Sequence, residues 1–196
     1  MSVSRVQMEL PAARLPHHVE ILLDETSGPL SDWQAEHDRN SFVPADYVLV
    51  FDALAALRSK MTSRPTHFME WGSGFGVATL LASSLGWKAR GIEIQPPLVR
   101  ESRRFNQVFD LSAEFYSGSF FPSDANAVKK LKNLCQQSEV IYVYPWPDQE
   151  IEIFDLFDRI ASPGTWLIAY YGVEDLRIFR KQGTFTSPKS SDSSNA

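Results

Sequence analysis

The chain has 196 residues, enough for one α/β domain with a single buried core. Its hydrophobic fraction of 43% and charged fraction of 22% are ordinary for a globular protein and exclude bulk disorder. A formal net charge of −5 disfavours nucleic acid as a partner, although a local basic patch stays compatible with it. The single cysteine, Cys135, excludes an intrachain disulfide and a cysteine-rich metal site, and the histidines show no metal-ligand spacing.

The chain carries no signal for export or for a membrane. The first fifteen residues scatter charged side chains among apolar ones, and no segment is apolar for long enough to span a bilayer. We therefore expect a cytoplasmic protein that has no membrane partner and binds no metal.

The two ends of the chain differ in composition from its middle. Residues 1–40 mix short apolar runs with polar clusters such as Asp24–Gly28, which predicts an irregular extension with a single helical turn. Residues 183–196 are dominated by Ser, Thr and Lys, which predicts a disordered tail. We therefore place the folded domain at residues 41–182.

In the middle of the chain, apolar runs alternate with longer amphipathic segments, as in βα units. The predicted helices are Pro44–Lys60, Val77–Leu85, Pro97–Phe109, Asp124–Gln136 and Asp148–Ile160. The predicted strands are His67–Trp71, Lys88–Ile94, Ala113–Tyr116, Glu139–Tyr144 and Thr165–Tyr171, with Leu176–Lys181 as a candidate edge strand. Five strands alternating with helices predict an α/β fold with three layers and a doubly wound, mostly parallel sheet.

The strongest local signal is a strand, a glycine-rich turn and a helix in succession. The turn reads Gly72-Ser-Gly-Phe-Gly76, and its glycines let backbone N–H groups approach a ligand at a helix N-terminus. The next strand ends in Glu93, about twenty residues after the first glycine, where a carboxylate can accept hydrogen bonds from both ribose hydroxyls. The two features together predict a nucleoside cofactor.

The residues around the turn favour S-adenosylmethionine over a dinucleotide. Val77 stands where the dinucleotide fingerprint has its third glycine, and no Gly-Lys-Ser or Gly-Lys-Thr follows as in a P-loop. Glu70, just before the turn, would repel a pyrophosphate but suits the ammonium group of a methionine moiety. A role for Glu70 as a cap of the following helix stays open.

These motifs resemble the class I S-adenosylmethionine-dependent methyltransferases. The resemblance rests on Phe68-Met-Glu-Trp-Gly-Ser-Gly-Phe-Gly76 and Gly91-Ile-Glu-Ile-Gln-Pro-Pro-Leu-Val99. It implies a Rossmann-like fold with strand order 3-2-1-4-5, counting the five predicted strands along the chain. Because few residues remain after Gly172, we expect the edge of the sheet beyond the fifth strand, the far edge, to be reduced. The segment Asn40–Tyr47, which leads into the first predicted helix, more specifically resembles the corresponding segment of small protein-lysine methyltransferases.

The resemblance also implies site residues. Those implied for the methionine part of the cofactor are Glu70, Gly72, Ser73, Gly74 and Gly76. Those implied for ribose and adenine are Glu93, Ile94, Ser119 and Phe120. Ser119 stands where the family usually has an aspartate, and a serine accepts from adenine without charge assistance.

The residues after the fourth strand are the candidates for methyl transfer. Tyr144 would contact both cofactor and acceptor, and Asp148 would accept the acceptor's proton. Tyr47, Pro145 and Trp146 would line the substrate cleft. Core packing stays open as an alternative for Phe120 and Trp146, and a role at a helix N-terminus stays open for Asp148.

We therefore predict an S-adenosylmethionine-dependent methyltransferase. Tyr144-Pro-Trp-Pro147 is not the Asn/Asp-Pro-Pro-Tyr motif of enzymes that modify amides and amino bases, and we favour a protein lysine or another amine as acceptor. The alternative is a non-catalytic S-adenosylmethionine-binding module, or one subunit of a hetero-oligomer whose partner supplies the acceptor site. An NAD-dependent dehydrogenase is a more distant alternative.

Overall fold

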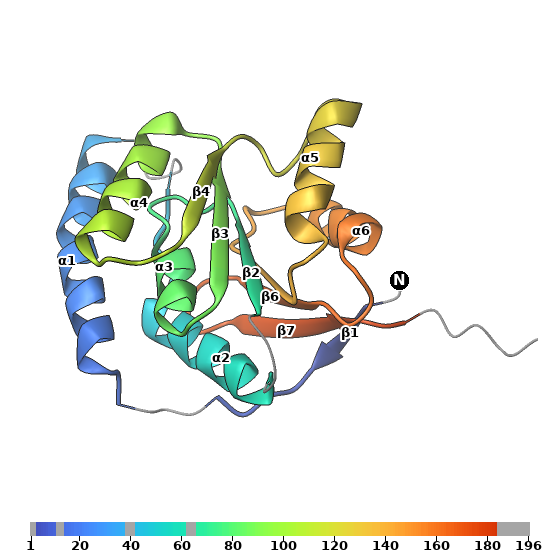
Figure 1. Ribbon diagram of the computed structural model, residues 1–196, viewed down its shortest axis with the longest axis horizontal. Helices are drawn as coiled ribbons and strands as arrows, with labels where there is room; N and C mark the ends of the chain where they lie inside the picture. The colour runs from blue at the N-terminus through green and yellow to red at the C-terminus, as the bar shows by residue number, and fades with distance from the viewer. Residues whose placement is uncertain (1–2, 11–13, 38–41, 62–65, 184–196) are drawn as a thin grey trace, which may run out of the picture.

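A mixed sheet forms the centre of the molecule (Figure 1). The computed structural model describes residues 3–10, 14–37, 42–61 and 66–183, and within these ranges the sheet has seven strands in the order β1-β7-β6-β5-β2-β3-β4. The strands are β1 (Val3–Val6), β2 (His67–Trp71), β3 (Lys88–Glu93), β4 (Glu114–Ser117), β5 (Val140–Val143), β6 (Trp166–Tyr170) and β7 (Leu176–Lys181). Strands β2 to β6 are parallel, whereas β7 and β1 are antiparallel to their neighbours.

Helices cover both faces of this sheet (Figure 1). One face carries α1 (His17–Glu36), α2 (Tyr47–Lys60), α3 (Val77–Ser84) and α4 (Pro96–Val108), and the other carries α5 (Ala125–Cys135) and α6 (Glu150–Ile160). Each face packs its own apolar cluster: Leu54 and Leu81 belong to the first, and Leu156 and Phe157 to the second. The predicted three-layer α/β architecture is confirmed.

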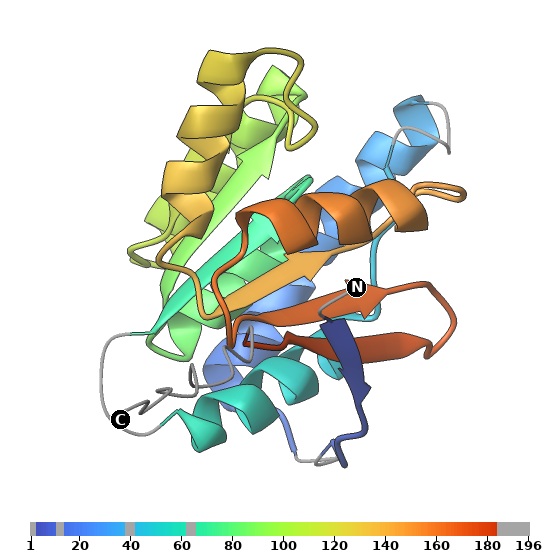
Figure 2. The same cartoon turned by 90° about the vertical axis from the view of Figure 1, so that its right-hand side faces the viewer.

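The strand order differs from the prediction at the far edge of the sheet. The five parallel strands run β4-β3-β2-β5-β6, as expected, but two further strands follow β6. β7 pairs with β6, and β1 pairs with β7, with Val3 opposite Lys181 (Figure 2). The expectation of a reduced far edge is therefore wrong, because the N-terminal segment supplies backbone partners for the outer side of β7.

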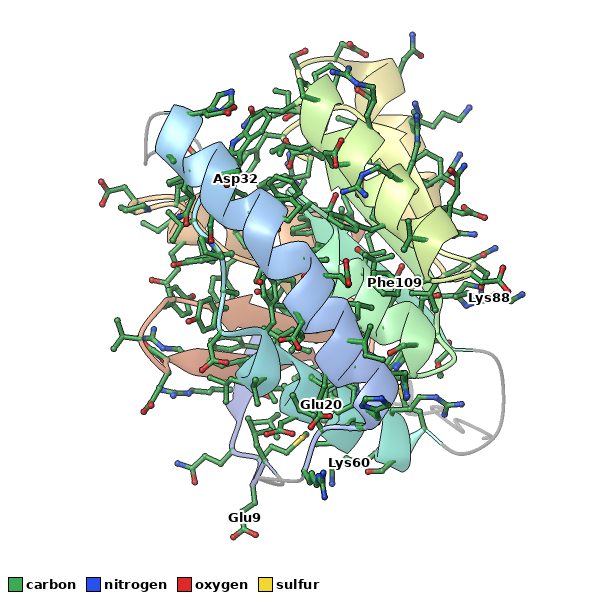
Figure 3. All side chains as sticks on the ribbon, turned by 90° about the vertical axis from the view of Figure 1, so that its left-hand side faces the viewer. Glu9, Glu20, Asp32, Lys60, Lys88 and Phe109 are labelled. Carbon is green, nitrogen blue, oxygen red and sulfur yellow. The ribbon has the colours of Figure 1, made fainter. Side chains whose placement is uncertain are left out.

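The expectation that residues 1–40 are irregular is also wrong. Besides β1, this segment contains the twenty-residue helix α1, which lies across the outside of its face of the sheet (Figure 3). α1 buries Val19, Leu22, Thr26 and Leu30, whose spacing of three or four residues places them on one side of a helix. Its polar residues Asp24 and Glu25 are exposed. The tail predicted to be disordered lies outside the described residues, except for Gly183.

The other predicted elements are present, with ends shifted by about three residues at most. The largest shift is at α2, which begins at Tyr47 rather than at Pro44. The Asp46 carboxylate sets this start, because it accepts hydrogen bonds from the backbone N–H groups of Val48 and Leu49 at 3.0 Å each. None of the described helices is long and apolar enough to cross a membrane.

Candidate functional site

A pocket of about 630 Å³ lies at the carboxyl ends of the parallel strands, where open α/β sheets bind their ligands. Its volume suits a small organic molecule. The predicted site residues that line it are Tyr47, Glu70, Gly72, Ser73, Gly74, Glu93, Ile94, Ser119, Phe120, Tyr144, Pro145, Trp146 and Asp148. Sequence segments up to about a hundred residues apart therefore meet around one cavity.

Gly76 does not line this pocket, although the resemblance implies that it contacts the cofactor. It is the N-terminal cap of α3, and its φ of 77° lies in the left-handed region that favours glycine. A Cβ at this position would lie 2.4 Å from the Phe115 ring and 2.7 Å from Ser102 Cβ. Gly76 is therefore placed for close packing of α3, and its contact with a ligand stays a prediction.

The rest of the glycine turn lies between β3 and the aromatic ring of Phe42. The backbone N–H groups of Gly72 and Ser73 both donate to the Ile92 carbonyl at 2.9 Å. A Cβ on Gly74 would lie 2.4 Å from the Phe42 ring, so only glycine fits here without displacing that ring. Phe42 in turn packs edge-on against Phe75.

Glu93 joins the glycine turn to the end of β3. One oxygen of its buried carboxylate accepts from Gly74 N at 2.8 Å, and the other accepts from Gln95 N at 2.8 Å. Each carboxylate oxygen has more than one acceptor position, so Glu93 can also receive hydrogen bonds from ligand hydroxyls. The carboxylate is held in place before any ligand arrives.

Glu70 lines the same pocket, and the structure shows the second of the two roles left open for it, the capping of α3. Its Oε2 accepts from the backbone N–H of Thr79 at 2.9 Å and from the Thr79 hydroxyl, so it caps α3. Burial raises the pKa of Glu70 to about 8, against the effect of the Thr79 hydrogen bonds, and the charge of Glu93 adds to the rise. A cation bound next to Glu70 would favour its charged form.

Tyr47, Tyr142 and Tyr144 also line this pocket, and Tyr170 packs against Tyr144. The Tyr144 and Tyr170 rings meet edge to face at 4.8 Å, and the Tyr170 hydroxyl accepts from Asp46 N. Burial raises the pKa values of Tyr47 and Tyr142 far above the usual value for tyrosine, so both hydroxyls stay protonated.

Tyr142 lines the pocket but was not predicted from the sequence. It lies on β5, two residues before Tyr144, which directly follows the strand, so the two-residue period of extended backbone places both side chains on one face. That period is the signal that could have identified it.

The side of the pocket assigned to adenine is built from the ends of β3 and β4. Ile94 is 65% exposed at the rim, and Phe120 stacks on Trp71 with ring centroids 5.9 Å apart. The Ser119 hydroxyl accepts from Phe121 N at 3.0 Å and donates to Phe121 O at 3.1 Å, which closes a local turn. Phe120 thus both packs against a core residue and faces the cavity.

The opposite side, assigned to the acceptor, is aromatic and acidic. Trp146 is 39% exposed, and Asp148 has a φ of 71°, which is uncommon for a residue other than glycine. Glu150 also lines the pocket and accepts from the Tyr171 hydroxyl at 2.7 Å. The Arg177 guanidinium lies 4.2 Å from the centre of the Tyr171 ring and fixes this rim.

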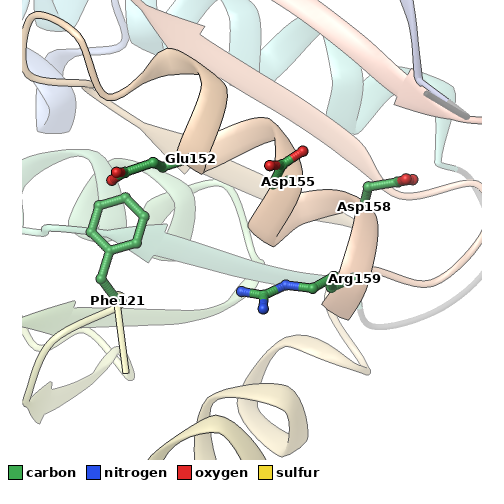
Figure 4. A pocket seen from close by; sticks show the side chains of 5 residues that line it. All are labelled: Phe121, Glu152, Asp155, Asp158 and Arg159. Carbon is green, nitrogen blue, oxygen red and sulfur yellow. The ribbon is translucent and has the colours of Figure 1, made fainter. Parts of the chain in front are cut away.

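A second hollow, of about 490 Å³, lies beside α6 and contains none of the predicted site residues. Figure 4 shows Phe121 facing Glu152, with Asp155, Asp158 and Arg159 further along the helix. No group of three or more His, Cys, Asp or Glu is arranged to hold a metal ion anywhere in the described part of the chain.

No protein-family model matches the chain, and no curated protein matches it. Solved structures do match. An RNA methyltransferase from Salinibacter ruber in complex with S-adenosyl-L-homocysteine is 21% identical, with a TM-score of 0.56, and the match covers 75% of this chain and 97% of that one. The chain shares the fold of a methyltransferase.

Two further structures support this likeness. An O-methyltransferase from Bacillus cereus in complex with S-adenosylhomocysteine is 15% identical, with a TM-score of 0.58, over 81% of this chain and 67% of that one. An S-adenosylhomocysteine-bound methyltransferase from Podospora anserina is 13% identical, with a TM-score of 0.57, over 79% of this chain and 62% of that one. S-adenosylhomocysteine is what S-adenosylmethionine becomes once its methyl group has been transferred.

Proposed function

We propose that the chain is an S-adenosylmethionine-dependent methyltransferase. The observation that carries the proposal is the hydrogen bond of Gly74 N to Glu93, because it joins the glycine turn and a carboxylate at the end of β3 into one binding surface. Glu93 would receive the ribose hydroxyls, Glu70 the ammonium group, and Ile94 with Phe120 the adenine ring. The three S-adenosylhomocysteine-bound neighbours of the same fold support this arrangement.

The chain's own contribution to the reaction is positioning. The cofactor, when bound, supplies a methyl group on a positively charged sulfur that a nucleophile displaces in line. The Glu93 carboxylate and the glycine turn would fix the nucleoside end, while Tyr144 and Trp146 hold the acceptor in line with the methyl group. Positioning of this kind supplies about 7–11 kcal/mol of a reaction barrier.

We propose an amine as the acceptor, carried either by a protein lysine or by a small molecule. Tyr144 and Trp146 contribute aromatic rings to the pocket lining, and such rings attract cations by about 0.5–2 kcal/mol. Asp148 adds a carboxylate to this lining, whereas Glu150 is paired with Arg177 at 3.7 Å. An ammonium group must lose a proton before it can attack, and we propose that water or Asp148, which lines the pocket, accepts it.

Binding and transfer are tested in sequence. Calorimetric titration with S-adenosylmethionine and with NAD should give binding of the first and none of the second; the reverse result would overturn the proposal. Labelled methyl groups from S-adenosylmethionine should then enter a lysine-rich peptide or a small primary amine, and not an RNA oligonucleotide or a phenol. Cofactor binding without transfer to any acceptor in a cell extract would indicate the non-catalytic module instead.

A further inference from the structure

The pocket lining includes two residues whose hydroxyl groups have no hydrogen-bond partner in the described part of the chain. These are Ser73 Oγ and Tyr142 Oη, and both are buried. A buried hydroxyl without a partner costs free energy, so such groups call for an explanation. Of the tyrosines that line the pocket, Tyr142 is the one whose buried hydroxyl lacks a partner among the described residues.

The fold places these two hydroxyls beside Glu70. Tyr142 is the register partner of Glu70 in the β2–β5 pair, so their side chains leave the same face of the sheet side by side. Ser73 follows in the turn that leaves β2, and a Cβ on Gly91 would lie 2.8 Å from Ser73 Cβ, so glycine on the neighbouring strand makes room for it. Glu70, Ser73 and Tyr142 all line the pocket.

The chemistry of this trio is complementary to an amino-acid zwitterion. Glu70 provides carboxylate oxygens that accept from an ammonium group, and the two hydroxyls donate to a carboxylate. Tyr142 keeps its proton at every physiological pH because burial raises its pKa, so it is a constant donor. A nucleoside without the amino-acid part would leave both hydroxyls without a partner.

We propose that Tyr142, together with Ser73, recognises the carboxylate of the cofactor's amino-acid end and makes the pocket selective for ligands that carry the complete amino acid. This inference rests on the proposed function. It assigns Tyr142 to ligand specificity, whereas its central place in a strand suggests a core residue.

Two ligands separate this role from a general effect on binding. S-adenosylhomocysteine carries the amino acid, whereas 5′-methylthioadenosine has the same adenosine and thioether without it. Calorimetry with Tyr142→Phe should show affinity for S-adenosylhomocysteine reduced about ten- to hundredfold, the size of one hydrogen bond to a charged group, and affinity for 5′-methylthioadenosine unchanged. Ser73→Ala should show the same selectivity.

Tyr116→Phe is the matched control, because Tyr116 is on β4 and its hydroxyl bonds Glu114 outside the pocket. It should leave both affinities unchanged. Without ligand, Tyr142→Phe should melt at the same temperature as the wild type or higher, since it removes a buried hydroxyl that lacks a partner. A hydroxyl with a purely structural role would lower the melting temperature.

The proposal is overturned if Tyr142→Phe binds S-adenosylhomocysteine as the wild type does, or if it loses affinity for both ligands equally. If Tyr142→Phe does not fold, Ser73→Ala decides by the same two affinities. Wild-type protein that binds neither ligand would refute the proposed function itself. The two failures are therefore distinguishable.

Discussion

Glu70 and Glu93 line one pocket but are held in different ways. Glu93 accepts hydrogen bonds from two backbone N–H groups on separate segments, which fixes both of its oxygens. Glu70 accepts from the single residue Thr79, and its burial moves its pKa to about 8. The first is therefore a rigid acceptor, whereas the second changes its charge close to neutral pH.

Glu93→Ala should weaken S-adenosylmethionine binding by about 1.5–3 kcal/mol, because it removes charge-assisted hydrogen bonds to ribose. Calorimetric titration measures this loss. The same change removes the carboxylate that accepts from Gly74 N and Gln95 N, so thermal melting must show that the variant is folded. Glu101→Ala, on the surface of α4, is the control. Wild-type affinity in a folded Glu93→Ala protein would contradict the ribose assignment.

Glu70 should make the protein less stable as the pH rises. The pKa is raised from 4.5 to about 8 on folding, so between these values the folded protein holds a proton that the unfolded chain has lost. The contribution of Glu70 to stability is thus complete below about pH 4.5, declines through this window, and is lost above about pH 8.

Glu70→Gln removes this titration. The free energy of unfolding, from urea denaturation at pH 5, 7 and 9, should therefore shift in favour of the variant as the pH increases. Glu101→Gln should show no such trend. A difference between Glu70→Gln and the wild type that stays constant from pH 5 to pH 9 would show that Glu70 titrates normally.

At the scale of elements, the sequence predicted the βα units well because each carries its own pattern. β2, the glycine turn and α3 were recognised from local spacing alone, and so was the carboxylate at the end of β3. α1 was missed because Asp24–Gly28 and Pro29 are typical of a loop, and its buried side includes a threonine. The Thr26 hydroxyl is satisfied by the Leu22 carbonyl at 2.9 Å, which a sequence pattern does not reveal.

The misses in the site have a similar cause. The packing role of Gly76 depends on Phe115 and Ser102, which reach it from β4 and α4. Tyr142 is at a central strand position that is usually apolar core, and its relation to Glu70 exists only through strand pairing. These properties arise from contacts between segments that are distant in the chain, so the sequence pattern did not predict them.

Substitutions at two adjacent positions test the packing of α1. Leu22→Ala should lower the free energy of unfolding by about 2–5 kcal/mol, because Leu22 is 2% exposed and its loss leaves a cavity. Ile21→Ala, at a 42% exposed position of the same helix, should cost far less. Chemical denaturation of both variants measures the difference. Similar costs at the two positions would mean that α1 does not pack as described.

At the scale of the whole molecule, the two sheet edges differ in origin. β4 forms one edge, and Arg103 donates to the Phe115 carbonyl there at 2.6 Å. At the other edge β1 pairs with β7, and Gln182 donates to the Ser4 hydroxyl at 2.5 Å. A segment from the start of the chain thus covers the backbone groups of its last strand.

Deletion of residues 1–8 should therefore expose the outer side of β7. We expect a lower melting temperature and a tendency to associate, because an unpaired edge strand is a template for pairing between molecules. Thermal melting and light scattering measure the two effects. Ser4→Ala keeps the strand and should change neither. A truncated protein that stays monomeric and equally stable would show that β1 is dispensable.

The pairing of β1 with β7 also fixes an order of folding. Ser4 and Gln182 are 178 positions apart, so β1 cannot pair until β7 is in place. Contacts between such distant residues form late, since closing a longer loop loses more chain entropy. We therefore expect the parallel strands β2 to β6 and the ligand pocket to assemble first and β1 to join them last.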